Sequence, residues 1–293
     1  MSRKITRRRT LSGVAAAAIA ALGSRIGDAA DAAEVVPLRG VPSRKPVSFK
    51  SGGQTCYGFV HTPGTSFGRS PGVLLIHGLV DSAAGPHRMF IALADALADA
   101  GFTSLRFDLR GRGNSDGQSI DITPSNDLED ARNALQLLRE QPNLDGDNLI
   151  LLGHGYGGVL AAMLSDAPGV KRTVLLAAAP PDHDVWKIPP TRDYNGRRAV
   201  DVGGYLISQA FYDAAKELEP TSVLKKSRRP VLLVHGTRDE MLLPSAYDRF
   251  ASDLRFSEVD AKEATIQGAD HAFTKHEWEQ EAIVAVVGWV RGA

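Results

Sequence analysis

The stretch Gly153-His154-Gly155-Tyr156-Gly157-Gly158 lies between two segments of different character. Before it comes the short apolar run Leu149–Leu152, which has the length and composition of a buried strand. After it, Tyr156–Leu164 is rich in apolar and small residues and is predicted to form a helix. Glycines in such a turn let the backbone bend sharply and let the following helix pack closely against the strand. The stretch therefore predicts a tight strand-to-helix turn, from which the fold can be worked outward.

Apolar runs alternate with amphipathic segments on both sides of this turn. A β-hairpin is predicted first, from Val47–Lys50 and Thr55–His61. Further strands are predicted at Val73–Ile76, Thr103–Leu109, Val174–Ala178, Val231–Val234 and Ala264–Gln267. Helices are predicted at Met89–Leu97, Asn126–Arg139, Ser245–Leu254 and Glu277–Val290. Alternation of this kind predicts an α/β fold with a mostly parallel, doubly wound sheet that is covered by helices on both faces.

One insertion, at about residues 180–229, breaks the alternation. It holds several prolines and five aromatic residues, Trp186, Tyr194, Tyr205, Phe211 and Tyr212. We expect it to form a short cap over the carboxyl ends of the strands, because sheets of this type bind ligands there. The alternative is an irregular surface excursion that contacts no ligand.

The N-terminal 32 residues have the pattern of an export signal. The basic start Thr6-Arg7-Arg8-Arg9-Thr10-Leu11 precedes an apolar run to Leu22, and Ala30-Asp31-Ala32 has the small-x-small form of a cleavage site. This order resembles a bacterial twin-arginine signal, which implies export to the periplasm or the medium. The apolar run is about a dozen residues, too short to span a bilayer, so no stable membrane insertion is expected after cleavage. The alternative for residues 1–32 is a disordered basic tail with an alanine-rich helix.

The rest of the chain has the composition of one ordinary globular domain. Residues 33–46 carry three prolines and are expected to be an extended lead-in to a domain over residues 47–293. The 34 basic and 34 acidic residues balance, so no basic surface argues for nucleic acid as a partner. The single cysteine excludes an intramolecular disulfide and a cysteine-based metal cluster. No phosphate-binding or dinucleotide motif is present, and Asp182-His183-Asp184 is a poor metal pattern, so we expect no cofactor and no metal.

Four short polar motifs follow predicted strands, in a fixed order. They are His77-Gly78-Leu79, the turn from Asp108 to Ser115, His235-Gly236-Thr237-Arg238-Asp239, and Gly268-Ala269-Asp270-His271. Within the second motif, Asp108 and Arg110 are expected to organise the loop and Arg112 to be solvated. His154, before the glycine-rich turn, is expected to pack beneath that turn.

With these motifs, residues 47–293 resemble an α/β-hydrolase, and within that superfamily the feruloyl-esterase-like and serine-aminopeptidase-like hydrolases. Such enzymes carry a nucleophile on a G-x-S-x-G turn, followed along the chain by an acid and a histidine base. The resemblance implies that Asp239 is the acid, that His271 is the base, and that the N–H groups of Leu79 and Tyr156 form the oxyanion hole. It also implies a small-molecule substrate or ligand, such as an ester with an aryl or acyl group.

Gly155 departs from the family pattern, because it stands where the nucleophilic serine is expected. Glycine has no side chain that could attack a carbonyl carbon, so no acyl-enzyme can form at this residue. A glycine here also relieves the backbone strain that a nucleophile normally bears, about 1–3 kcal/mol.

Three interpretations of Gly155 remain open. The pair His271–Asp239 could activate a water or abstract a proton from carbon, which would make the chain an atypical hydrolase or a lyase or isomerase. The chain could instead be a non-catalytic ligand-binding protein. A relocated nucleophile is the third interpretation, with Ser82 and Ser115 as candidates, although both are typical turn residues.

Overall fold

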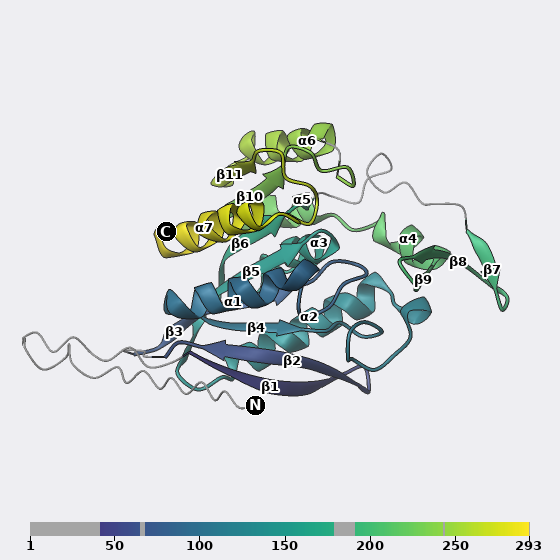
Figure 1. The fold of residues 1–293 in the computed structure, drawn as a ribbon, viewed down its shortest axis with the longest axis horizontal. Helices are drawn as coiled ribbons and strands as arrows, with labels where there is room; N and C mark the ends of the chain where they lie inside the picture. Colours follow the sequence, from purple (N-terminus) through teal and green to yellow (C-terminus); the bar gives the residue numbers. More distant parts are fainter. Residues whose placement is uncertain (1–41, 65–67, 179–190, 243, 293) are drawn as a thin grey trace, which may run out of the picture. The chain divides into compact units, whose positions relative to one another are not determined.

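The computed structural model describes residues 42–64, 68–178, 191–242 and 244–292. Eight of the described strands form one large sheet (Figure 1). All of them belong to one unit, Arg39–Ala293. The eight-stranded sheet has the order β1-β2-β4-β3-β5-β6-β10-β11. Strands β1 and β2 form an antiparallel hairpin, β2 pairs antiparallel with β4, and the other pairs are parallel. The strand bounds are β1 Ser43–Ser51, β2 Gln54–Thr62, β3 Ser70–Ile76, β4 Thr103–Phe107, β5 Leu144–His154, β6 Val170–Leu176, β10 Val231–Gly236 and β11 Ala261–Ile266.

Helices cover both faces of this sheet because its strands are apolar on both sides. In β3, Val73 and Leu75 join the core cluster of helices α1 and α7, whereas Leu74 and Ile76 join the cluster of α2, α3, α5 and α6. Successive side chains of a strand point to opposite faces, so a continuous apolar run fills two cores. The predicted doubly wound architecture is confirmed. The helix bounds are α1 Met89–Asp99, α2 Pro124–Arg139, α3 Tyr156–Met163, α5 Pro220–Ser227, α6 Pro244–Arg255 and α7 His276–Gly292.

The register of the parallel strands brings their carboxyl ends to one edge. Ile76 lies opposite Gly153, and Leu176 lies opposite both His154 and Val234. The loops that begin after these residues therefore open on the same side of the sheet, which is where an open α/β sheet binds ligands.

The insertion differs in detail from the expectation. Its described part contains a second, antiparallel sheet of β7 Arg192–Tyr194, β8 Arg197–Val202 and β9 Tyr205–Ser208, followed by α4 Gln209–Ala215. The expected end at residue 229 is wrong, because α5 contacts α3 and α6 and so belongs to the helix layer of the main sheet. The cap segment therefore ends before Pro220.

The cap rests on a short 3₁₀ helix, Ser119–Asp121. The Arg197 guanidinium donates to the Asp121 carboxylate at 2.6 Å and to the Ile120 carbonyl at 2.7 Å. The Leu206 N–H donates to the Ser119 hydroxyl at 3.1 Å. These contacts join β8 and β9 to the segment that leads into α2.

Several sequence predictions fall on residues outside the described ranges. They are the export signal at residues 1–32, most of the lead-in, and the segment 179–190 with Trp186 and Asp182-His183-Asp184. The lead-in prediction of 33–46 is too long at its end, because residues 43–46 already pair with β2. Among the described helices, none has both the length and the apolarity needed to cross a bilayer.

Candidate active site

The turn after β5 has the geometry of a nucleophile elbow. Gly155 has φ 53° and ψ −121°, a conformation that L-residues rarely adopt. Its N–H donates to the Leu176 carbonyl at 2.9 Å, and its carbonyl accepts from Gly158 N–H at 3.0 Å. The tight turn predicted from the glycine-rich stretch is confirmed, with α3 beginning directly at Tyr156.

His271 and Asp239 form a hydrogen-bonded dyad beside this turn. The Nδ1 of His271 lies 2.8 Å from Oδ2 of Asp239. The other carboxylate oxygen accepts from the N–H groups of Met241 and Leu242 at 2.9 and 2.7 Å. Because a carboxylate accepts, the neutral form of His271 carries its proton on Nδ1 and has its lone pair on Nε2. Asp239 thus fixes the tautomer in which His271 can act as a base.

The basic nitrogen of the dyad faces the missing side chain. A Cβ built on Gly155 would lie 3.2 Å from Nε2 of His271. Among the described residues beyond its chain neighbours, no other atom would lie closer than 3.8 Å to that point. The structure therefore brings Gly155, His271 and Asp239 together as the resemblance implies, with open space where the serine side chain would stand.

Two further histidines hold the loop that carries His271. His154 donates from Nε2 to the carbonyl of His271 at 2.9 Å, and His87 Nε2 lies 2.8 Å from the carbonyl of Ala272. Burial lowers the pKa of His154 to about 3, so its ring is neutral. His154 is buried directly before the turn, and its ring lies 5.0 Å from the ring of His271 between centroids. His87 also contacts Glu279 at 2.8 Å and was not singled out from the sequence.

A buried ion pair supports both residues expected at the oxyanion hole. Arg112 donates from Nε to the carbonyl of Leu79 at 2.8 Å and makes two hydrogen bonds to Asp127, at 2.6 and 3.0 Å. Burial is the main cause, and the Asp127 carboxylate the second, of a pKa of Tyr156 well above its usual value. The expectation that Arg112 is solvated is wrong, since only 1% of it is exposed. Its partner Asp127 lies 15 residues further on in α2, which no local pattern could reveal.

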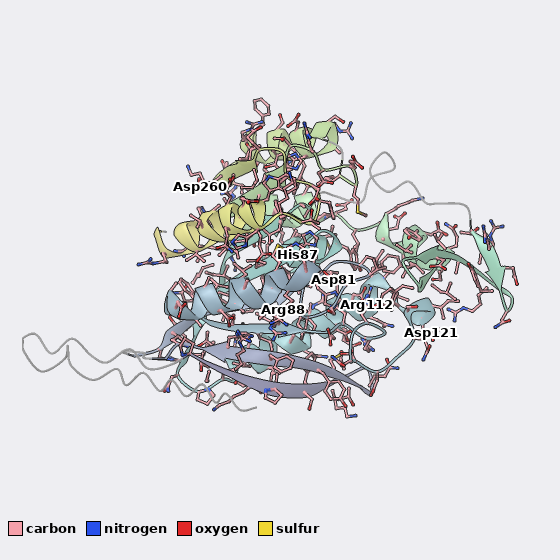
Figure 2. All side chains as sticks on the ribbon, in the orientation of Figure 1. Asp81, His87, Arg88, Arg112, Asp121 and Asp260 are labelled. Carbon is pink, nitrogen blue, oxygen red and sulfur yellow. The ribbon has the colours of Figure 1, made fainter. Side chains whose placement is uncertain are left out.

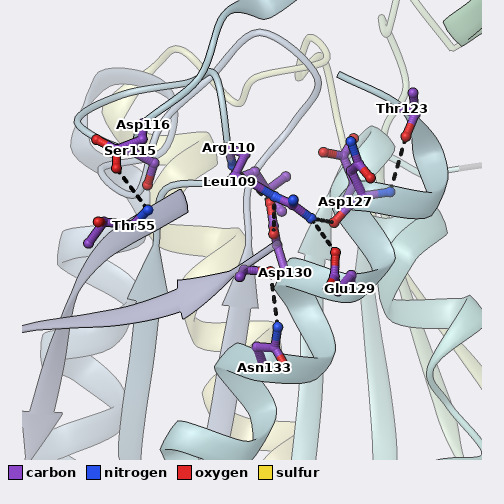
Figure 3. Close-up of polar contacts among 12 residues, drawn as sticks. Thr55, Leu109, Arg110, Ser115, Asp116, Thr123, Asp127, Glu129, Asp130 and Asn133 are labelled. Carbon is purple, nitrogen blue, oxygen red and sulfur yellow. Dashed lines mark hydrogen bonds and ion pairs between the residues drawn. The ribbon is translucent and has the colours of Figure 1, made fainter. Parts of the chain in front are cut away.

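The second loop motif behaves as expected at its other positions. Asp108 accepts from the N–H groups of Ala83 and Asn114, at 2.5 and 2.9 Å, and so joins two loops at this edge of the sheet. Figure 3 shows Arg110 between the carboxylates of Glu129 and Asp130, at 2.7 and 2.6 Å. Both residues organise the loop around the site without lining it.

A cavity of about 490 Å³ opens at the turn and at the dyad. Residues of the cap, of the loop after β3 (the oxyanion loop, residues 77–81) and of the loops after β10 and β11 line it, and most are apolar. The lining residues are Gly78, Leu79, Val80, Asp81, Pro86, His154, Gly155, Tyr156, Val159, Ala177, Val202, Tyr212, Met241, Leu242, His271 and Ala272. The cap thus contributes to a ligand-sized space, through Val202 and Tyr212.

Neither candidate for a relocated nucleophile lines this cavity. Ser115 donates to the Asp108 carbonyl at 2.6 Å and accepts from Tyr57 N–H at 3.0 Å. Ser82 accepts from Ala84 N–H at 3.3 Å and is a turn residue. No serine, threonine or cysteine is among the described lining residues, and the segment 179–190 contains none in its sequence. Within the described part of the chain, no three His, Cys, Asp or Glu side chains gather into a metal site.

Known proteins resemble this chain in sequence and in structure. Among curated sequences, esterase EstD of Thermotoga maritima is 23% identical over 59% of this chain and 47% of its own length. The uncharacterized protein YfhR of Salmonella typhi is 27% identical over 61% of this chain and 59% of its own length. The chain therefore spans about half the length of these relatives.

Two solved esterase structures have the same fold. Est1E of Butyrivibrio proteoclasticus, solved with ferulic acid bound, superposes with a TM-score of 0.65 at 22% identity, over 84% of this chain and 96% of its own. The esterase domain of a Rhodothermus marinus protein gives a TM-score of 0.67 at 21% identity, over 85% and 98%. The sequence profile of the alpha/beta hydrolase family matches residues 73–282. That match covers the sheet from β3 onward, the turn at Gly155, Asp239 and His271, and the chain belongs to this family.

Proposed function

We propose that this chain is an atypical esterase-like hydrolase in which His271 and Asp239 activate a water molecule directly. The carrying observation is the position of His271 Nε2, 3.2 Å from the point where a Cβ of residue 155 would lie, with Asp239 2.8 Å behind Nδ1. The space that a serine side chain would fill is left for the attacking oxygen.

The proposed reaction has two steps. Nε2 of His271 takes a proton from water as the water oxygen attacks the ester carbonyl, and Asp239 stabilises the resulting imidazolium. The carbonyl oxygen becomes an oxyanion, which the N–H groups of Leu79 and Tyr156 stabilise. The intermediate then expels the alcohol, which receives its proton from the imidazolium. The net reaction converts an ester and water into an acid and an alcohol, with no covalent enzyme intermediate.

The surroundings of the dyad support this role over a purely structural one. The Arg112–Asp127 pair holds the oxyanion loop through the Leu79 carbonyl. His154 and His87 hold consecutive carbonyls of the loop with His271. The mostly apolar cavity fits an acyl or aryl group. Groups that are held in fixed positions around an imidazole lone pair can lower the barrier of a reaction that forms an oxyanion.

Turnover of a panel of 4-nitrophenyl esters, from acetate to octanoate, tests the proposal. General acid–base groups contribute about 10²–10⁴-fold to rates, so His271→Ala is expected to lower turnover by at least about 100-fold. His276→Ala is the matched control, because His276 is exposed on α7, outside the cavity. Mass spectrometry of the protein during turnover should show no acylated species. Equal rates in the wild type and His271→Ala would contradict the proposal.

The same experiment separates the alternatives. Exchange of substrate C–H hydrogens with deuterated water, dependent on His271 and without ester cleavage, would identify a base that acts on carbon. Saturable binding of the esters with neither reaction would identify a ligand-binding protein. Accumulation of an acylated protein would point to another nucleophile in the chain.

A further inference from the structure

Asp81 is a carboxylate on the wall of an otherwise mostly apolar cavity. It follows the oxyanion residue Leu79 by two positions and lines the same space as Gly155 and His271. Its side chain is half-buried, and Oδ1 accepts from the N–H of Ser82 at 2.7 Å. This is the one hydrogen bond that the described residues give it, and no described cation forms an ion pair with it. Figure 2 labels Asp81 and His87, whose imidazole lies close enough to act on the Asp81 carboxylate.

Three cationic side chains of the neighbouring loops make contacts elsewhere. Arg112 is committed to Asp127 and to the Leu79 carbonyl, and Arg106 donates to His61 and to the Ala83 carbonyl. His87 contacts Glu279 and the Ala272 carbonyl. No lysine or arginine is among the described residues that line the cavity. Among the described residues, no lysine or arginine forms an ion pair with the Asp81 carboxylate, and the His87 imidazole is near enough to act on it.

A carboxylate at such a place is costly unless a ligand neutralises it. Burial raises the pKa of Asp81 and the Asp108 carboxylate adds to this effect, whereas the Ser82 N–H and the His87 imidazole oppose it. A cationic ligand group would restore the charged form and make a charge-assisted hydrogen bond. A carboxylate-bearing ligand would meet repulsion in a space of low polarity.

We propose that Asp81 selects substrates that carry a protonated amine, so that the preferred ligands are amino-substituted esters with an apolar acyl chain. That such ligands are substrates rests on the proposed function, but their recognition by Asp81 requires no turnover. Oδ1 accepts from the Ser82 N–H, whereas Oδ2 accepts from no described residue. A compact ammonium suits one oxygen, whereas a guanidinium gains most from two.

Binding of three matched ligands tests the recognition without catalysis. The probes are 4-phenylbutylamine, 4-phenylbutanol and 4-phenylbutanoate, which share one apolar body and differ in charge. Isothermal titration calorimetry at pH 7.5 is expected to give an affinity for the amine at least about tenfold above that for the alcohol, with the acid weakest.

Two variants connect this preference to the residue. Asp81→Asn keeps an oxygen for the Ser82 N–H and should reduce the amine preference to within about twofold. Asp260→Asn removes an exposed carboxylate that pairs with Lys262 at 3.3 Å, and should leave the preference unchanged. Thermal unfolding of each variant checks that it is folded. No amine preference in the wild type, or an equal preference in Asp81→Asn, would overturn the proposal.

A catalytic comparison separates this inference from the proposed function. If both hold, kcat/KM for 4-nitrophenyl 6-aminohexanoate should exceed that for 4-nitrophenyl hexanoate at least about tenfold, and Asp81→Asn should remove the excess. An Asp81-dependent amine preference in binding, with no turnover of either ester, would support the recognition and contradict the hydrolase. His271-dependent turnover with equal kcat/KM for both esters would support the hydrolase and overturn the inference.

Discussion

At the base of the turn after β5, a Cβ added to Gly153 or to Gly157 would lie 2.1 Å from a backbone carbonyl oxygen. At the tip of the same turn, a Cβ added to Gly155 would meet, among the described residues, only the imidazole of His271, at 3.2 Å. Side chains are therefore excluded from the base by the backbone of β3 and α3. At the tip, space is available and only the positive φ favours glycine.

Within the five residues from Gly153 to Gly157, glycine is therefore required by packing at the base but not at the tip. The base must be glycine for α3 to pack on the sheet, whatever the protein does. The tip is the position at which the fold tolerates a side chain at a cost of about 1–3 kcal/mol. The dyad, the oxyanion loop and the cavity all converge on the tip. The imidazole of His271 thus faces a position of the turn that carries no side chain.

The largest expected effect is a gain of covalent chemistry in Gly155→Ser. The serine Cβ would fit once the His271 ring moved by a few tenths of an ångström, and that ring is 21% exposed on its side chain. Removing such a nucleophile costs about 10⁶-fold in one serine protease, so even imperfect restoration should raise ester hydrolysis by at least about 100-fold. A fluorophosphonate probe should label this variant and leave the wild type unlabelled.

Two companion variants make that result specific. Gly155→Ala adds the Cβ without the hydroxyl and should stay unlabelled. Gly155→Ser with His271→Ala should label at least about 100-fold more slowly, because the base is absent. Labelling of Gly155→Ala would show that the probe reacts elsewhere. Failure of Gly155→Ser to label, in a folded protein, would show that the oxyanion groups or the dyad are misplaced.

The next largest effect is on stability and tests the base of the turn. In Gly157→Ala the new Cβ would lie 2.1 Å from the Ile76 oxygen and 2.4 Å from the His77 oxygen, and neither backbone can move cheaply. We expect a loss of about 3 kcal/mol or more in the free energy of unfolding. Gly155→Ala should lose less, about 1–3 kcal/mol, from its positive φ. Urea unfolding measures both, and equal losses would invalidate the comparison.

The sheet and the dyad could be predicted from sequence because their signals are local. Apolar runs mark the strands, and parallel pairing brings every strand end to one edge, so polar motifs after strands must gather there. Gly155, Asp239 and His271 meet for this reason. The cap sheet was missed because its strands are three to six residues long and the first two are rich in arginine.

Arg112 and Asp81 show why the remainder of the site could not be predicted. The environment of Arg112 is set by Asp127, which the chain brings near only through the packing of α2 on the sheet. The role inferred for Asp81 depends on the apolar residues that share its cavity, some of which, such as Val202 and Leu242, are distant in the sequence. Neither fact leaves a trace in the local sequence.

A smaller effect concerns the histidines at the base, which are neutral in the folded chain. Burial lowers the pKa of His154 to about 3 and that of His77 to about 4. The unfolded chain binds protons as the pH falls below about 6.5, whereas the folded chain does not until the lower pKa is reached. The contribution of these two histidines to the free energy of unfolding is therefore complete above about pH 6.5 and is lost as the pH falls toward 4.

The expected slope is at most about 1.4 kcal/mol per pH unit for each histidine. Urea unfolding at pH 7.5, 6.5, 5.5 and 5.0 measures it, above the range where most carboxylates titrate. His154→Gln can still donate to the His271 carbonyl and should reduce the slope by about one proton. An unchanged slope in this variant would show that the pKa of His154 is the same in the folded and the unfolded chain.

The smallest expected effect is at the cap, on the wall opposite the tip. The ion pair of Arg197 and Asp121 is short, but the side chains are 46% and 60% exposed. Exposed pairs contribute about 0.2–1 kcal/mol, because water competes for both charges. A double-mutant cycle with Arg197→Ala and Asp121→Ala should give a coupling energy in this range. A coupling above about 2 kcal/mol would mean that a surface contact holds the cap, and that the cavity facing Gly155 depends on salt concentration.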